Sequence, residues 1–242
     1  MKKLLMIIVC FLAMLVSMPT MAQKKKQLDW KDGKMPELTD VKEINDYLLT
    51  CDTIINNLKS LDENLVWYKV QPVKVTEEDG TVSETYHIVD QNGNFRGKSE
   101  ALKQTLDVIS VCIILPLKAA NIGLQTPLYS TSLPKLGFGA MKYAKYAKLG
   151  PQLAARCTTD VVDILSKLRK QGKAIRELKR MTNEKGELTD PNIDISKVEG
   201  LEEFTETEAI QKSSSELAEL LAQEQAGDSN IGDFDESALD IE

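Results

Sequence analysis

The chain has 242 residues and a formal net charge of −7, from 30 basic and 37 acidic side chains. This length allows one domain with appendages, and a core that needs no disulfide staples. Aromatic residues make up only 5% of the chain, so we expect an aliphatic core. The single histidine, His87, excludes multi-histidine metal sites and disfavours a Ser-His-Asp triad.

The N-terminus has the pattern of an export signal. Lys2 and Lys3 precede an apolar run from Leu4 to Val16, and Ala22 is a small residue suited to signal peptidase. The run is too short for a spanning helix, which takes about 20 residues. We predict a signal peptide at 1–22, cleaved during export to a bacterial periplasm or the cell exterior. No later segment is expected to span a membrane.

A polar linker is predicted at 23–38, followed by a helical domain at 39–182. Apolar residues in steps of three and four predict an amphipathic helix that begins near Asp40. The pattern then alternates, which predicts a β-hairpin at about 66–90. Pro72 within the hairpin indicates an edge strand or a bulge.

Further helices are expected to complete this domain. A helix from Ser99 toward Leu124 is apolar nearly all round, which is typical of a buried helix. Pro116 is expected to kink this helix, and Pro127 to mark its end at the latest. A third helix is expected to start near Pro134.

We expect Gly150-Pro151 to break or bend the third helix, and a fourth to run from Gln152 to about Met181. Its apolar positions form a short heptad pattern that permits coiled-coil pairing, with an ordinary bundle helix as the alternative. These positions are Val161, Ile164, Leu168, Gln171, Ile175 and Leu178.

The C-terminal part is less regular. Turn residues predict a loop at 183–204, a weaker periodicity predicts a possible helix at 205–225, and the acidic composition predicts a disordered tail at 226–242. The expected fold class is therefore mainly α: a helical bundle of amphipathic helices with one inserted β-hairpin and a disordered acidic C-terminal tail.

Charge is segregated along the chain. Residues 98–181 carry 15 basic and 5 acidic side chains, whereas residues 200–242 carry 13 acidic side chains and one lysine. One interpretation is that the acidic tail screens the basic helices within one molecule; the other is that the basic face meets an anionic partner. In a periplasm that partner would be a lipid, a lipopolysaccharide or an acidic protein, and not a nucleic acid.

The basic region contains a candidate contact for such a partner. Lysines beside tyrosines in one helix suit a membrane surface, although the small residues nearby equally favour close helix packing. The candidate contact residues are Lys135, Lys142, Tyr143, Lys145, Tyr146 and Lys148.

No constellation of catalytic, cofactor-binding or metal-ligating residues is visible in the sequence. Cys51, Cys112 and Cys157 fall on predicted apolar helix faces, where a cysteine acts as a small hydrophobe; a bridge between two of them remains an alternative. We therefore expect an exported cell-envelope protein with an interaction or scaffold role and no catalysis, whose partner is an envelope protein or a second copy. The alternative is a membrane- or lipid-binding protein that uses the basic helices at 132–181.

Overall fold

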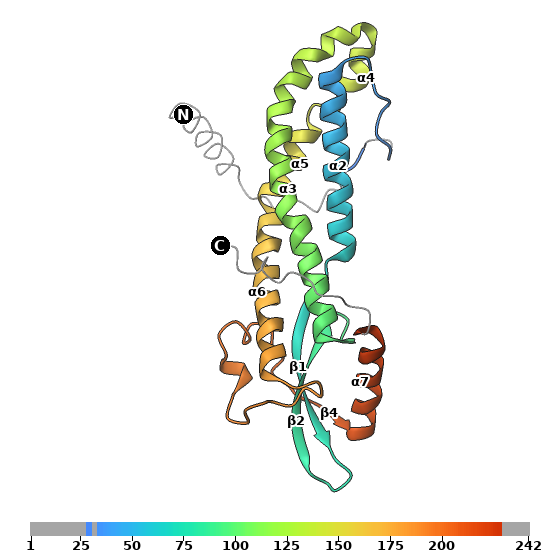
Figure 1. Ribbon diagram of the computed structural model, residues 1–242. Helices are drawn as coiled ribbons and strands as arrows, with labels where there is room; N and C mark the ends of the chain where they lie inside the picture. Colours follow the sequence, from blue (N-terminus) through green and yellow to red (C-terminus); the bar gives the residue numbers. More distant parts are fainter. Residues whose placement is uncertain (1–27, 31–32, 229–242) are drawn as a thin grey trace. The chain divides into compact units, whose positions relative to one another are not determined.

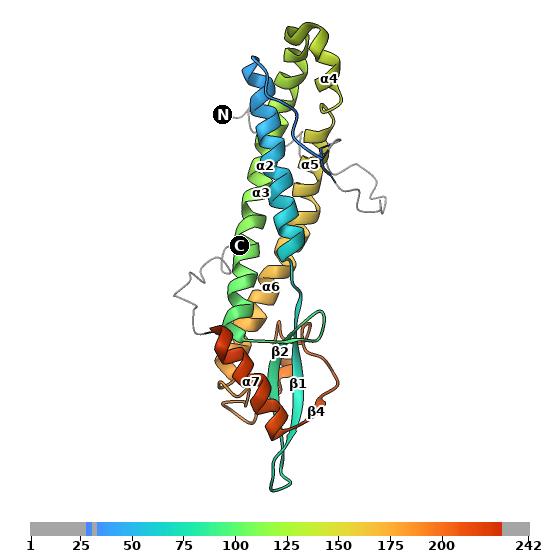
Figure 2. The same ribbon diagram turned by 90° about the vertical axis from the view of Figure 1, so that its right-hand side faces the viewer.

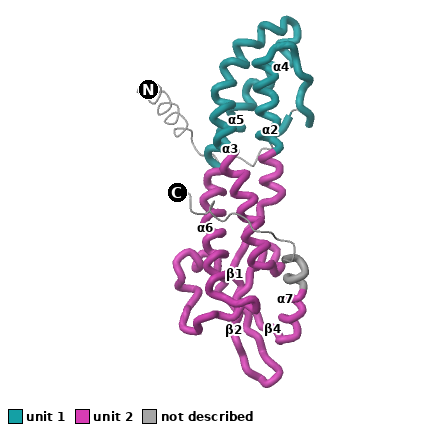
Figure 3. Tube along the Cα trace, viewed as in Figure 1, with its two compact units in different colours: residues 1–56, 115–160 teal, residues 57–114, 161–242 magenta. Residues whose placement is uncertain are grey.

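A computed structural model describes residues 28–30 and 33–228 (Figure 1). The predicted signal peptide and residues 229–242 of the predicted acidic tail lie outside the described residues. The described residues are mainly helical, with 59% of them in helices, and they contain a four-stranded sheet. It divides into two compact units, of residues 1–56 with 115–160 and of residues 57–114 with 161–242 (Figure 3). We call these unit 1 and unit 2.

The regular elements described in unit 1 are all helices. Two long helices, α2 and α3, each contribute one part to unit 1, and shorter helical segments complete it (Figures 1 and 2). The helices concerned are α2 (Lys42–Asn64), α3 (Lys98–Ser132), η1 (Leu133–Gly139), α4 (Ala140–Ala144) and α5 (Leu149–Thr158).

Helix α2 follows the periodicity of the sequence. Its residues at steps of three and four are almost completely buried, and this face forms much of the core of unit 1. The buried residues that α2 contributes to unit 1 are Ile44, Tyr47, Leu48, Cys51, Ile54 and Ile55. Just before the helix, the Thr39 hydroxyl accepts a hydrogen bond from the Val41 N–H at 3.1 Å, which fixes the entry of the chain.

The end expected for the second helix at Pro127 was wrong. Helix α3 runs through both Pro116 and Pro127 to Ser132. Each proline removes one backbone N–H, but buried side chains on both sides of each proline, Cys112, Leu115 and Tyr129 among them, anchor the helix to the core. Packing therefore outweighs the local cost of proline in this helix.

The third helix is shorter and less regular than expected. A 3₁₀ segment, η1, occupies the positions around Pro134, and α4 has only five residues. Gly137 causes the interruption, because its φ of 56° and ψ of −124° are not helical. Gly150 and Pro151 do not break the chain here; they lie in the first turn of α5, where a proline is tolerated.

Unit 2 is built on a sheet in the order β3-β2-β1-β4. The antiparallel pair of β1 and β2 covers the region predicted as a hairpin, and β4 adds a parallel strand to β1. Strand β1 is therefore an inner strand, so of the two alternatives indicated by Pro72 the edge strand is wrong and the bulge remains. The strands are β1 (Tyr68–Thr76), β2 (Val82–Asp90), β3 (Phe95–Arg96) and β4 (Ile210–Ser213).

Pro72 is accommodated by an irregularity on the β4 side of β1. Pro72 lies opposite Tyr86, whose N–H donates to the Gly186 carbonyl and not to β1. The nitrogen of Pro72 consequently points away from β2, toward the β4 side of β1. It lies between the bridge at Val70–Thr205 and the start of β4 opposite Val73. No ladder hydrogen bond needs an N–H at this position.

Besides the parts of α2 and α3 that belong to it, unit 2 contains α6 (Asp160–Met181), α7 (Ser214–Asp228) and the short η2 (Ile195–Lys197). The helix expected at 205–225 begins at Ser214, and β4 occupies the four residues before it. Leu217 of α7 packs with Val73 and Val75 of β1, so α7 covers this part of the sheet (Figure 2).

Candidate binding surfaces

The structure separates the six predicted contact residues into two groups. All six lie between η1 and the start of α5 in unit 1, and the four lysines are exposed. Tyr143 and Tyr146 are only 6% and 5% exposed. The two tyrosines therefore lie beneath the surface that the four lysines form.

The two tyrosines instead hold the segment before α2 against the short helical segments of unit 1. The Tyr143 hydroxyl donates to the Glu37 carbonyl at 2.8 Å, and the Tyr146 ring packs edge-on against Trp30 at 5.4 Å between centroids. Trp30 lies in the predicted linker and is buried, with its indole N–H donating to Asp52 at 2.8 Å. This stretch of the predicted linker thus packs on unit 1.

Two more tyrosines in the core hold the backbone of the same segments. The Tyr47 hydroxyl donates to the Tyr146 carbonyl at 2.9 Å and accepts from the Gly150 N–H at 2.8 Å. The Tyr129 hydroxyl donates to the Tyr143 carbonyl at 2.6 Å, and its ring stacks on Tyr47 at 4.1 Å between centroids. Burial raises the pKa of both phenols, so they remain neutral donors.

Acidic residues of unit 1 partly neutralise the lysines. Lys135 pairs with Glu43 at 3.2 Å and Lys142 with Glu37 at 3.4 Å. The pKa of Glu43 is lowered, first by a hydrogen bond from its own backbone N–H and then by Lys135. Lys145 lies over the Tyr146 ring at 4.9 Å. This surface is therefore mixed in charge.

Sequence reasoning missed the apolar residues that stand out beside these lysines. Phe138 at the end of η1 and Met141 in α4 are almost completely exposed. The signal that could have found Phe138 is its position between Gly137 and Gly139, because glycines on both sides favour a turn and not a buried helix face.

A second exposed apolar surface lies on α3. Leu117, Leu124 and Leu128 in unit 1 are 70%, 75% and 55% exposed. By length and composition, the stretch Lys98–Ala144 is a candidate membrane span, in contrast to the sequence expectation, with 39% of its most apolar window buried. Core helices of soluble proteins share this length and composition.

The heptad pattern predicted in the fourth helix is not on the surface. It lies on α6 in unit 2, where Leu168, Gln171 and Leu178 are buried among the residues of the unit's core. Gln171 accepts from the Tyr68 N–H at 3.0 Å and donates to the Val66 carbonyl at 3.3 Å and the Thr105 hydroxyl at 3.0 Å. The pattern therefore matches the ordinary bundle-helix alternative.

Acidic residues just before β4 partly screen the basic residues of unit 2. Lys170 of α6 pairs with Glu203 at 3.2 Å, and Lys69 of β1 pairs with Glu206. These exposed pairs each contribute little to stability, about 0–1 kcal/mol. They agree with the screening interpretation for this segment, while the 229–242 part of the tail lies outside the described residues.

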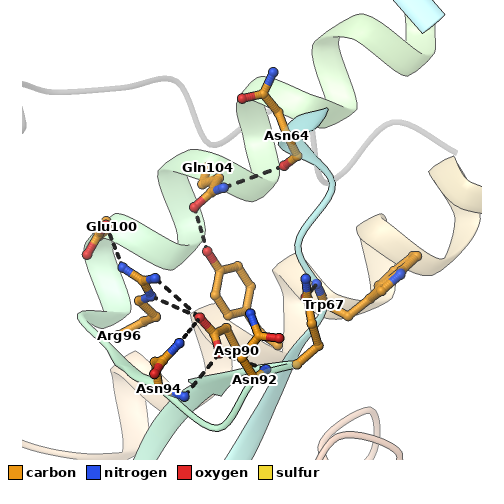
Figure 4. A network of polar contacts seen from close by, with 10 residues as sticks. Asn64, Trp67, Asp90, Asn92, Asn94, Arg96, Glu100 and Gln104 are labelled. Carbon is orange, nitrogen blue, oxygen red and sulfur yellow. Dashed lines mark hydrogen bonds and ion pairs between the residues drawn. The ribbon is translucent and has the colours of Figure 1, made fainter. Parts of the chain in front are cut away.

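The polar residues of the sheet form structural turns and buried contacts. The Asp90 carboxylate accepts from the backbone N–H groups of Asn92 and Asn94 at 2.9 and 3.0 Å, and from Arg96 at 3.2 Å (Figure 4). Arg96 also lies 3.9 Å from Glu100 of α3. Burial would raise the pKa of Asp90, but these hydrogen bonds outweigh it and lower the pKa.

His87 and the cysteines are buried as well. His87 bonds the Thr85 hydroxyl at 3.0 Å, and burial, with a smaller effect of Lys98, lowers its pKa to about 4. Burial raises the pKa of Cys51, Cys112 and Cys157 to about 12, 11 and 12, and all three are free thiols. Among the described residues no three His, Cys, Asp or Glu side chains are grouped as metal ligands would be.

Comparison with known proteins places the chain in no family: no family model, no curated protein and no solved structure matches it.

Proposed function

We propose that this chain is an exported cell-envelope protein, a bundle of amphipathic helices with an inserted β-hairpin, that acts as an interaction or scaffold component and not as an enzyme. The observation that carries the proposal is the exposed apolar face of α3, with Leu117, Leu124 and Leu128. Contiguous exposed apolar surface on a soluble protein marks a site of interaction. The N-terminal pattern of Lys2 and Lys3 before an apolar run supports export.

The experiment is crosslinking in intact cells, followed by affinity purification of the tagged chain and mass spectrometry. The variant Leu124→Gln removes one exposed leucine of the α3 face, and Leu49→Gln removes a partly exposed leucine of α2 as the matched control. We expect a crosslinked product with the native chain and the control, and its loss with Leu124→Gln. Equal recovery from all three would contradict a role for this face.

A second candidate function is attachment to an anionic membrane surface. It is favoured by the exposure of Phe138 and Met141 beside Lys135, Lys142, Lys145 and Lys148. Apolar side chains enter the headgroup region while lysines contact anionic lipids. The pairing of two of these lysines with glutamates weighs against this candidate, because it reduces their attraction for anionic lipids.

Vesicle flotation tests the second candidate. The native chain is mixed with vesicles of phosphatidylcholine alone or with a third phosphatidylglycerol, at low and high salt. Membrane attachment predicts flotation with the anionic vesicles that falls with salt and is lost in Phe138→Ser. Val82→Ser, at an exposed valine of the hairpin in unit 2, is the control. No flotation at low salt would remove this candidate.

A further inference from the structure

The exposed residues of α3 in unit 1 have the spacing of a coiled-coil seam. Leu117, Asn121, Leu124, Leu128 and Thr131 are all exposed and follow one another in steps of four, three, four and three. Steps that alternate between three and four keep residues on one narrow stripe of a helix. We call these five residues the α3 seam.

The residue types fit the two positions of a heptad. Leu117 and Leu124 take the d positions, where leucine favours two-stranded coiled coils, and Asn121 takes the a position between them. A single asparagine at an a position specifies the register and the number of strands. We infer that the α3 seam pairs with the α3 seam of a second copy of this chain, parallel and in register, so that Asn121 meets Asn121.

This inference rests on the proposed interaction role and names the partner. An asparagine side chain carries both a donor and an acceptor, so two copies of Asn121 can satisfy each other across a symmetric pair. In a lipid environment the same amide would be left without a partner, which is costly. The asparagine at the centre of the seam therefore favours a second copy over a bilayer.

The charges beside the α3 seam are compatible with this pairing. Lys118 is the charged residue nearest the seam, since from Ala119 to Pro134 the chain carries no charged side chain. In a parallel pair Lys118 takes an e position and faces the g position of the other copy, which is Ile113. Like charges are thus not brought face to face, and the lysine stem covers apolar surface.

The size of the α3 seam sets the strength of the pair. Fifteen residues of helix extend about 22 Å, and a strip about 10 Å wide then covers about 220 Å². A standard stable interface covers about 800 Å² on each partner. Because this area is well below the standard, we expect a weak, reversible dimer that is detected only at high protein concentration. The helix is already formed in the monomer, so pairing does not have to order it.

Sedimentation of the full chain over a concentration range tests the stoichiometry. We expect a monomer–dimer equilibrium for the native chain, and at least a tenfold higher dissociation constant for Leu124→Gln. Leu49→Gln, which changes a leucine outside the α3 seam, should leave the equilibrium unchanged. A native chain that remains monomeric well above 100 μM would overturn the inference.

Cysteine crosslinking tests the register. Under mild oxidation Asn121→Cys should give a disulfide-linked dimer, because parallel in-register pairing places both copies of position 121 together. Ser130→Cys is the matched control, exposed on the same helix but away from the seam. The native cysteines in the described residues are buried and should not react. Equal crosslinking of the two variants, or none at 121, would overturn the parallel pairing.

The two proposals can fail separately. A monomeric native chain that still captures another envelope protein through Leu124 would overturn the self-pairing and leave the interaction role in place. A monomer that captures no protein at all would overturn both. Self-pairing in solution, together with recovery of a second tagged copy from cells, would support both.

Discussion

The two units of this protein differ in which side chains they bury and which they expose. Among the described residues, the buried polar or charged side chains lie in unit 2 with the exception of Ser132. Most of the large exposed apolar side chains, by contrast, belong to unit 1: Leu38, Leu49, Leu117, Leu124, Leu128, Phe138 and Met141.

The contrast concerns how each unit satisfies its polar groups and how much apolar surface it exposes to water. Unit 2 encloses groups such as Gln171 and Asp90 and satisfies them with internal hydrogen bonds. Such networks specify one arrangement of strands and helices. Unit 1 uses tyrosine hydroxyls to tie its short segments together and leaves apolar side chains in water, which costs free energy unless another molecule covers them. Both proposed binding surfaces accordingly lie in unit 1.

The largest expected effect concerns the buried amide of unit 2. Gln171→Leu removes the partners of the buried Tyr68 N–H and of the half-buried Val66 carbonyl, and leaves both without these hydrogen bonds. We expect the free energy of unfolding to fall by about 4 kcal/mol. Urea unfolding measures the loss. Gln152→Leu, at an exposed position of unit 1, should change it by less than about 0.5 kcal/mol. If both variants lowered the free energy of unfolding by a similar amount, the buried amide of unit 2 would not have the special role described here.

The next effect is a pH dependence specific to unit 2. The folded pKa of His87 is about 4, against 6.5 for the free side chain, because burial disfavours the charged form. The stability contributed by the neutral imidazole is complete above pH 6.5 and is lost as the pH falls toward 4. The loss amounts to about 3 kcal/mol. Urea unfolding between pH 7 and 4.5 measures it.

The control for this pH dependence is His87→Gln. His87 is the single histidine of the chain, so the variant should show a much flatter profile over the same pH range. Carboxylates titrate in the same way in both proteins and cancel in the comparison. Parallel profiles for the native chain and the variant would mean that His87 is accessible to protons in the folded state.

The smallest expected effect tests the tyrosine contacts of unit 1. A Cβ atom at Gly150 would lie 2.7 Å from the Tyr47 hydroxyl, so Gly150→Ala has to displace that ring. We expect a loss of about 2 kcal/mol in thermal or urea unfolding. Gly123→Ala in α3, where a Cβ meets no atom within 4 Å, should instead stabilise by about 0.5–1 kcal/mol. If Gly150→Ala did not lower the stability, the surroundings of the Tyr47 ring would be loosely packed.

The sequence predicted those helices and strands whose apolar residues recur at a regular spacing. The apolar stripe of α2 and the alternation at 66–90 depend on neighbours a few residues apart, and the structure has a helix and two paired strands there. The sequence did not predict strand β4. Ile210–Ser213 is short and largely exposed, and it forms a strand by pairing with Val73–Thr76, which is distant in the sequence. Pairing between distant segments leaves no local pattern to find.

The burial of the tyrosines in the candidate contact set could not be predicted for a similar reason. Tyr146 is buried by Trp30 and tied through its carbonyl to Tyr47, which lies 99 residues earlier in the chain. Spacing along one helix cannot reveal such a partner. The α3 seam was overlooked because α3 is apolar nearly all round, and the sequence alone does not say which side of such a helix the rest of the fold covers.

The buried thiols impose a condition on the order of events during biogenesis. Cys51, Cys112 and Cys157 are inert in the folded protein, because their sulfur atoms are shielded and their thiolate forms are disfavoured. The same sulfurs are open to oxidants in an unfolded chain that enters an oxidising compartment. For the proposed export, the yield of correctly folded protein therefore depends on whether the core forms before the thiols are oxidised and mispaired. Reducing conditions during refolding should favour the native state.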